Sequence, residues 1–174
     1  MKPAPKDSVV GIIADTHIPA CKPGYLEFCI KTFKEHGVTE VVHIGDLVDH
    51  HAISRHVAEP NADTAVTELN KALKEIKKWV KAFPEVKWCA GNHDQIPTRQ
   101  AKELGIPRHF IKSLNDLYEL PTTWVLANHH EIDGVWFEHG LGSGGMYGCK
   151  NTAMKLRSSY VQGHTHANAG VLYI

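Results

Sequence analysis

The chain has 174 residues, of which 43% are hydrophobic and 22% charged, and its formal net charge is zero. These values are typical of a soluble globular protein of one domain with a substantial core. Zero net charge argues against a long nucleic-acid footprint held by bulk electrostatics. No apolar run approaches the roughly 20 residues of a membrane span, and residues 1–7 have no signal-peptide core. We therefore predict a cytoplasmic protein.

The first part of the chain is predicted to form a strand, a helix and a second strand. The strand covers residues 8–14, and Pro23 begins a helix that Gly37 ends. The apolar residues between them recur at helical spacing. A second strand follows at residues 40–44. This order predicts a βαβ unit with parallel strands and a right-handed crossover.

A long helix is predicted over residues 63–83, where apolar residues form one stripe and Pro84 stops the pattern. Five lysines lie off the stripe, which favours a solvated helix face over a phosphate-binding patch. The polar residues 50–63 before this helix are predicted to form a loop, and a strand follows at residues 85–90.

Residues 95–123 are less regular, with helical fragments near 98–104 and 113–119. We interpret this segment as an insertion over the functional site, within a single domain that spans residues 1–174. Residues 124–132 and 135–138 alternate around Asp133-Gly134, which predicts a hairpin.

The glycine-rich run 140–148 lacks the GxxxxGK[ST] order and is predicted to be a flexible loop. A short helix near 151–158 leads into a last strand at residues 160–162. The cysteines form no CxxC pair, and reduced core thiols are favoured over a disulfide or a zinc site: Cys21, Cys29, Cys89 and Cys149.

Five predicted strands end in Asp, Asn or His. One such residue is more often a turn or helix-cap residue, but five repeats of one design predict a metal site built from strand ends. Divalent Mn, Fe or Zn ions bind imidazole and carboxylate together. Alternate residues of an extended chain project on the same side, so Asp-x-His and His-x-His can each serve one cluster. The blocks are Asp15-x-His17, Asp46, Gly91-Asn92-His93-Asp94, His139-Gly140 and Gly163-His164-x-His166.

Asp46 and His93 have distinct expected tasks in this site. Asp46 carries two oxygens at a rigid strand end, so it could bridge two cations. His93 lies next to a candidate ligand, and a site that cleaves an ester needs a proton for the leaving oxygen. Histidine is the usual donor near neutral pH.

These blocks, with Gly45-Asp46-x-x-Asp49 as the second, resemble in order the five blocks of the calcineurin-like metallophosphoesterase family. The resemblance covers residues 9–166. It implies an α/β fold, a four-layer α/β/β/α sandwich with mixed sheets, and a site at the strand ends.

By this resemblance one metal is held by Asp15, His17, Asp46 and His166. The other is held by Asp46, Asn92, His139 and His164. The resemblance further implies that a hydroxide shared by the metals attacks phosphorus. His93 then protonates the leaving group or stabilises the transition state, and Asp49 orients the ring of His93. Mn²⁺ is our choice of metal, and Zn²⁺, Fe²⁺ and Ni²⁺ suit the same ligands.

Two features depart from the family pattern. Protein phosphatases of the family have an arginine after the second Asp of GDxxD, where this chain has His50. Arg55 could replace it if the loop folds back, although a surface arginine is the favoured interpretation. The sequence also stops at Ile174, so the second sheet is either completed from the 124–138 hairpin or shortened.

Three functions are considered for this chain. A phosphodiesterase that acts on a nucleotide or nucleic acid is favoured, because the arginine that would bind a monoester dianion is missing. A phosphomonoesterase or protein phosphatase is the alternative, and a non-catalytic scaffold is disfavoured because every ligand position is filled. Among the other histidines, His43 is predicted to be a hydrogen-bonded core residue, whereas His50 and His51 lie beside the predicted site, where either could contact substrate. Five are predicted to lie on the surface: His36, His56, His109, His129 and His130.

Overall fold

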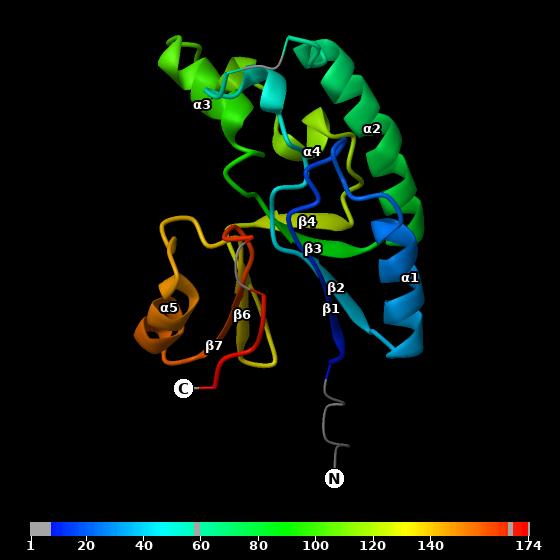
Figure 1. Ribbon diagram of the computed structural model, residues 1–174, viewed down its shortest axis with the longest axis vertical. Coiled ribbons are helices and arrows are strands. Elements are labelled where there is room, and N and C mark those ends of the chain that lie inside the picture. Colours follow the sequence, from blue (N-terminus) through cyan, green and yellow to red (C-terminus); the bar gives the residue numbers. More distant parts are fainter. Residues whose placement is uncertain (1–7, 58–59, 167–168, 174) are drawn as a thin grey trace.

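The computed structural model describes residues 8–57, 60–166 and 169–173, which form two β-sheets flanked by helices (Figure 1). The first sheet has the order β1-β2-β3-β4, and all its neighbours are parallel. In the second sheet β5 pairs antiparallel with β6, which pairs parallel with β7. The strands are β1 (Val10–Ile13), β2 (Glu40–His43), β3 (Val86–Cys89), β4 (Trp124–Ala127), β5 (His130–Ile132), β6 (Val135–Glu138) and β7 (Ser159–Gln162).

Helices α1 and α2 cover the face of the first sheet that points away from the second sheet, and α5 lies beside β7 (Figure 1). The α-helices are α1 (Tyr25–Glu35), α2 (Ala65–Ala82), α3 (Ile96–Glu103), α4 (Leu114–Leu117) and α5 (Gly148–Leu156). Short 3₁₀ turns occupy His51–Ile53 and Arg108–Phe110. The predicted α/β class with two sheets is confirmed, as is the parallel βαβ start.

Two apolar cores hold these layers together. The larger lies between the first sheet and its helices, where Trp79 of α2 and Cys29 of α1 are buried with Ile13 and Trp88 of the strands. The smaller lies between the two sheets and is built around Val42, Ile44, Ile132 and Phe137. Burial of large apolar side chains dominates the free energy of folding, so these cores fix how the ends of the two sheets meet.

The expected strand over residues 124–132 is wrong in one respect. Residues 124–127 form β4 and pair with β3 from Val86↔Trp124 to Cys89↔Ala127, so they belong to the first sheet. The chain then crosses to the second sheet, and only β5 and β6 form the predicted hairpin around Asp133-Gly134. The indole N–H of Trp124 donates to the Phe83 carbonyl at 2.9 Å, which holds β4 against the end of α2.

His130 is also placed differently from the expectation. It was predicted to lie on the surface, but its ring is half-buried and Nε2 lies 3.1 Å from the Trp88 carbonyl oxygen. That contact joins the first residue of β5 to β3, at the crossing between the two sheets. His129 is exposed as predicted, and its ring stacks on Trp136 with centroids 4.1 Å apart.

The segment 95–123 contains α3 and α4 and lies at the end of the molecule away from α5 (Figure 1). Leu114 and Tyr118 are buried in the larger core, whereas residues 102–110 are exposed. That this segment is an insertion in a single domain stays a prediction. All four cysteines are free, as expected, but only Cys29 and Cys89 are buried, and Cys149 is exposed rather than in the core. In the part of the chain that the structure describes, no helix is both long and apolar enough to span a bilayer.

Candidate metal centre

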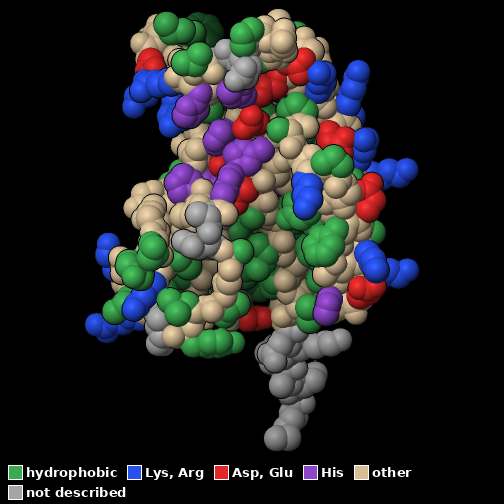
Figure 2. All heavy atoms as spheres, in the orientation of Figure 1, with side chains coloured by type: hydrophobic (Ala, Val, Ile, Leu, Met, Phe, Trp, Pro, Cys, Tyr) green, Lys and Arg blue, Asp and Glu red, His purple; other side chains and the backbone are tan. Residues whose placement is uncertain are grey.

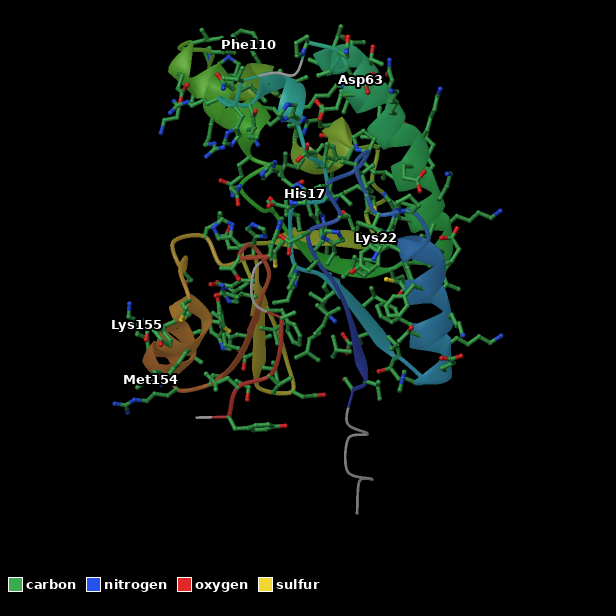
Figure 3. The ribbon with its side chains drawn as sticks, viewed as in Figure 1. His17, Lys22, Asp63, Phe110, Met154 and Lys155 are labelled. Carbon is green, nitrogen blue, oxygen red and sulfur yellow. The ribbon has the colours of Figure 1, made fainter. Side chains whose placement is uncertain are left out.

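The five predicted blocks meet where the carboxyl ends of the strands converge. The loops after β1, β2 and β3 approach the loops after β6 and β7, because the parallel strands of each sheet end on the same side. Figure 2 shows histidine side chains gathered with acidic ones on this face. His17 lies near the centre of the molecule, with α3 and α4 on one side and the second sheet on the other (Figure 3).

Asp15, His17 and His166 form the first cluster, in which one ligand atom of each lies within 4.8 Å of the others. Nε2 of His166 is 3.1 Å from Oδ1 of Asp15 and 3.3 Å from Nε2 of His17. Residues separated by about 150 positions therefore face one another. The backbone N–H of His164 donates to the Asp15 carboxylate at 3.1 Å, which binds the last block to the first.

Asp46, His139 and His164 form the second cluster under the same criterion. Nε2 of His139 lies 3.2 Å from Oδ2 of Asp46 and 3.0 Å from Oδ1 of Asn92. His139 and Asp46 are each only 2% exposed, whereas His164 is partly exposed, so one side of this cluster is shielded from water. All four residues of the second predicted ligand set are thus brought together.

Asp46 lies between the two clusters. Its Oδ2 is 3.2 Å from Nε2 of His139 and 3.7 Å from Nε2 of His17. Its Oδ1 accepts the backbone N–H of His93 at 2.8 Å, which fixes the orientation of the carboxylate. This position between the two sets is the one that a bridging carboxylate requires.

The chemistry of the facing atoms fits cations. Nδ1 of His139 lies 3.0 Å from the Ile44 carbonyl oxygen, which can only accept, so this nitrogen carries the proton. In the neutral ring, Nε2 is then a lone pair that faces two further acceptors, on Asp46 and Asn92. His17 is arranged similarly, with Nδ1 2.8 Å from Oδ1 of Asp49 and Nε2 directed at the cluster. Such sets of converging lone pairs are what a divalent metal ion binds.

Two glycines permit the close approach of these loops. A Cβ at Gly91 would lie 2.0 Å from Oδ1 of Asp46, and a Cβ at Gly163 would lie 2.4 Å from Oδ2 of Asp15. Each glycine of the GN and GH blocks therefore makes room for a carboxylate of the site.

Five of the seven predicted ligands have left-handed backbone conformations, with φ between 41° and 72°: Asp15, His17, Asp46, His164 and His166. This region is unfavourable for residues other than glycine, and such residues gather at functional sites. The strand ends thus turn sharply and aim the ligand side chains inward.

A third cluster joins His17, Asp49 and His93. Nδ1 of His93 lies 3.2 Å from Oδ1 of Asp49 and 2.6 Å from the Asp49 carbonyl oxygen. The hydrogen bond to the Asp49 carboxylate raises the pKa of His93 to about 9. Hydrogen bonds from His17 and His93 hold the pKa of Asp49 well below its usual range. Asp49 thus orients the ring of His93 and favours its protonated form.

Asp94 has a structural role that the sequence did not reveal. It is fully buried, and its carboxylate accepts the backbone N–H groups of Gly91, Leu47 and Val48 at 2.8–3.2 Å. Burial raises the pKa of Asp94 to about 6. The loops after β2 and β3 are therefore joined through one side chain.

The other histidines of the region hold the ligand loops. His43 is a hydrogen-bonded core residue as predicted, because Nε2 lies 3.2 Å from Oγ1 of Thr16 and burial lowers the pKa to about 3. His50 is 5% exposed and contacts the Tyr118 hydroxyl at 2.8 Å, so its side chain packs into the core. His51 lines a surface cavity.

Two arginines complete the description of the site. Arg55 is exposed and pairs with Glu103, which agrees with the favoured interpretation of a surface arginine. Arg99 was not singled out from the sequence, and no motif marks it. Its Nη2 donates to the Asn92 carbonyl oxygen at 3.3 Å, which places an exposed guanidinium beside a candidate ligand.

The comparisons with known proteins agree with this geometry. The family model described as calcineurin-like phosphoesterase matches residues 8–168. A search of curated proteins found no match. The matched span includes all five blocks.

Proposed function

Because the chain belongs to the calcineurin-like phosphoesterase family, we propose that it is a phosphoesterase that uses two divalent metal ions and prefers phosphodiesters of the nucleotide or nucleic-acid kind. The observation that carries this proposal is the position of Asp46 between two clusters of histidine and carboxylate ligands. A scaffold that only binds partners needs no such arrangement. Mn²⁺ is the proposed metal.

The proposed ligands are Asp15, His17 and His166 for one ion, Asn92, His139 and His164 for the other, and Asp46 for both. Bound ions would neutralise phosphate oxygens and lower the pKa of the attacking water. The remaining steps belong to side chains of this chain. His93, protonated near neutral pH, donates a proton to the leaving oxygen. Asp49 holds the ring of His93 in place through Oδ1.

The preference for diesters follows from the charges around the site. A monoester dianion is bound best by a guanidinium that grips two of its oxygens. His50 occupies the position where phosphatases carry that arginine, and its side chain is buried. Arg55 pairs with Glu103, and Lys71 of α2 pairs with Asp63. A diester carries one charge fewer and depends less on such a grip.

Arg99 supports the second candidate function, a phosphomonoesterase. Its guanidinium is exposed and lies beside Asn92, so it is the arginine placed to replace the missing one. The two candidates are separated by comparing kcat/KM for 4-nitrophenyl phosphate and bis(4-nitrophenyl) phosphate in Mn²⁺. We expect the diester to be favoured. A tenfold preference for the monoester, about 1.4 kcal/mol in transition-state binding, contradicts the diester assignment.

Two variants sharpen this comparison. Arg99→Ala lowers kcat/KM for the monoester alone if the guanidinium grips the dianion, and Arg55→Ala is the matched exposed control. Absence of turnover of either ester, together with absence of bound Mn²⁺, would instead favour the scaffold.

A further inference from the structure

A cavity of about 340 Å³ opens beside the proposed metal centre. Its walls come from the loop after β1, the turn that follows Asp49 and the beginning of α2. Figure 3 labels His17, which precedes one wall in sequence, and Asp63, which forms part of another. The lining residues are Pro19, Ala20, Asp49, His51, Ala52, Ala62, Asp63, Glu68 and Lys71. This volume is at the lower end for ligand sites, enough for a single ring with substituents.

Asp49 connects the cavity to the metal centre. Asp49 lines the cavity, and its carboxylate contacts Nδ1 of His17 at 2.8 Å and Nδ1 of His93 at 3.2 Å. A phosphorus held at the two clusters would therefore lie near Asp49, a residue of the cavity wall. A substituent bonded to that phosphorus through oxygen can reach into the cavity.

The charges of the walls exclude an anionic substituent. The lining residues include three acidic ones, Asp49, Asp63 and Glu68, against the two basic ones, Lys71 and His51. Both oxygens of Asp63 already engage the ammonium of Lys71, at 2.8 and 2.7 Å. A second phosphate in the cavity would therefore meet excess negative charge and no free lysine from these walls.

The carboxylate of Glu68 is satisfied by the protein itself. Glu68 is 6% exposed and accepts the backbone N–H groups of His51 and Ala52 at 2.8 and 3.0 Å. Apart from His51, the remaining lining residues are small and apolar: Pro19, Ala20, Ala52 and Ala62. Such walls favour the flat or apolar surface of a neutral group.

We propose that this cavity is the subsite for an uncharged organic arm of the substrate, such as an aryl or nucleoside group esterified to the reacting phosphate. The proposal rests on the proposed function, since it places the phosphorus at the two clusters. The proposed subsite restricts the substrates to phosphate esters in which at least one esterified group is a neutral ring. Compounds in which the group that enters the cavity is a further phosphate are disfavoured.

The test measures binding without turnover. Calorimetric titration of the Mn²⁺-loaded protein compares inorganic phosphate, which has no arm, with phenylphosphonate and 4-carboxyphenylphosphonate. We expect phenylphosphonate to bind at least fivefold more tightly than phosphate, and the carboxylate to remove most of that gain. A preference for phenylphosphonate below fivefold overturns the proposal.

Substitutions of lining residues test whether the preference for phenylphosphonate over phosphate arises in the cavity. Ala62 is exposed, so Ala62→Trp can fill the cavity without disturbing the core, and Ala65→Trp on α2 is a matched exposed control outside it. We expect Ala62→Trp to reduce the preference for phenylphosphonate to less than half of its original value, and Ala65→Trp to leave it unchanged. An unchanged preference in Ala62→Trp overturns the proposal. Ala20→Trp, from the opposite wall, gives the same test if Ala62→Trp does not fold.

The proposed function and the proposed subsite can be contradicted independently of each other. Protein that binds Mn²⁺ but hydrolyses neither nitrophenyl ester contradicts the proposed function. The affinity ratio between phenylphosphonate and phosphate then still decides whether the cavity binds a neutral ring.

Discussion

Replacing Gly91 by alanine is a direct test of the site's construction. The added Cβ would lie 2.0 Å from Oδ1 of Asp46 and 2.4 Å from the Asp46 backbone nitrogen, whereas ordinary contacts begin at 3.4 Å. The loops after β2 and β3 must therefore separate by more than about 1 Å. Overpacking of this kind typically destabilises a protein by about 1–3 kcal/mol.

Separating the loops after β2 and β3 should weaken metal binding as well as lower the stability of the fold. Oδ1 of Asp46 accepts the His93 N–H at 2.8 Å, and Asn92 follows Gly91 directly, so both the bridging residue and its partner are displaced. Losing support around metal ligands usually weakens metal binding by roughly 10–100-fold. We expect Gly91→Ala to lose Mn²⁺ affinity by at least tenfold in calorimetric titration, and to unfold at lower urea concentration without metal.

The control is Gly144→Ala, where the added Cβ meets nothing within 4 Å and the backbone is not left-handed. This variant should bind metal as the original protein does. If Gly91→Ala binds two ions with unchanged affinity, the tight contact between Gly91 and Asp46 does not shape the site, and the reasoning fails.

Three further predictions follow from the same geometry. Asp46→Asn should reduce bound metal, measured by elemental analysis, more than His17→Ala does, because Asp46 lies between both clusters; equal losses would contradict bridging. His93→Ala should retain both ions but lose roughly 10²–10⁴-fold in kcat, since general acid catalysis has that magnitude; a parallel loss of metal would make His93 a ligand. Burial lowers the pKa of His50 to about 4, so the unfolded chain binds a proton between pH 6.5 and 4 that the folded chain does not. Stability should therefore fall as pH decreases through that window, by an amount on the order of 2 kcal/mol from this group. His50→Asn should flatten the decrease in urea unfolding measured at pH 7 and pH 4.5, and an unchanged slope would contradict this account.

The sequence was sufficient to predict the sheets' approximate strands and the residues that meet at their ends. The reason is physical, since apolar runs that stop at Asp, Asn or His place those side chains at one edge of a parallel sheet. The crossing after β4 was not predictable in this way. Residues 124–132 alternate throughout, and periodicity does not reveal that a chain leaves one sheet for another at Asn128.

Contacts between residues that are distant in the chain could likewise not be predicted from sequence patterns. Asp94 was part of a recognised block, yet its three backbone N–H partners come from loops more than 40 residues apart. The approach of Arg99 to Asn92 depends on the first turn of α3, and no spacing rule marks it. The burial of His50 against Tyr118 depends on α4, whose position follows from core packing.

The buried carboxylate of Asp94 has a consequence for how metal ions enter. Because it accepts N–H groups of Gly91, Leu47 and Val48, it joins the loop that carries Asn92 to the loop that carries Asp46. If two ions bind as proposed, we expect the first ion to position ligands of both clusters through this link. The second ion would then bind to a site that is already arranged, and we expect the binding of the two ions to be cooperative.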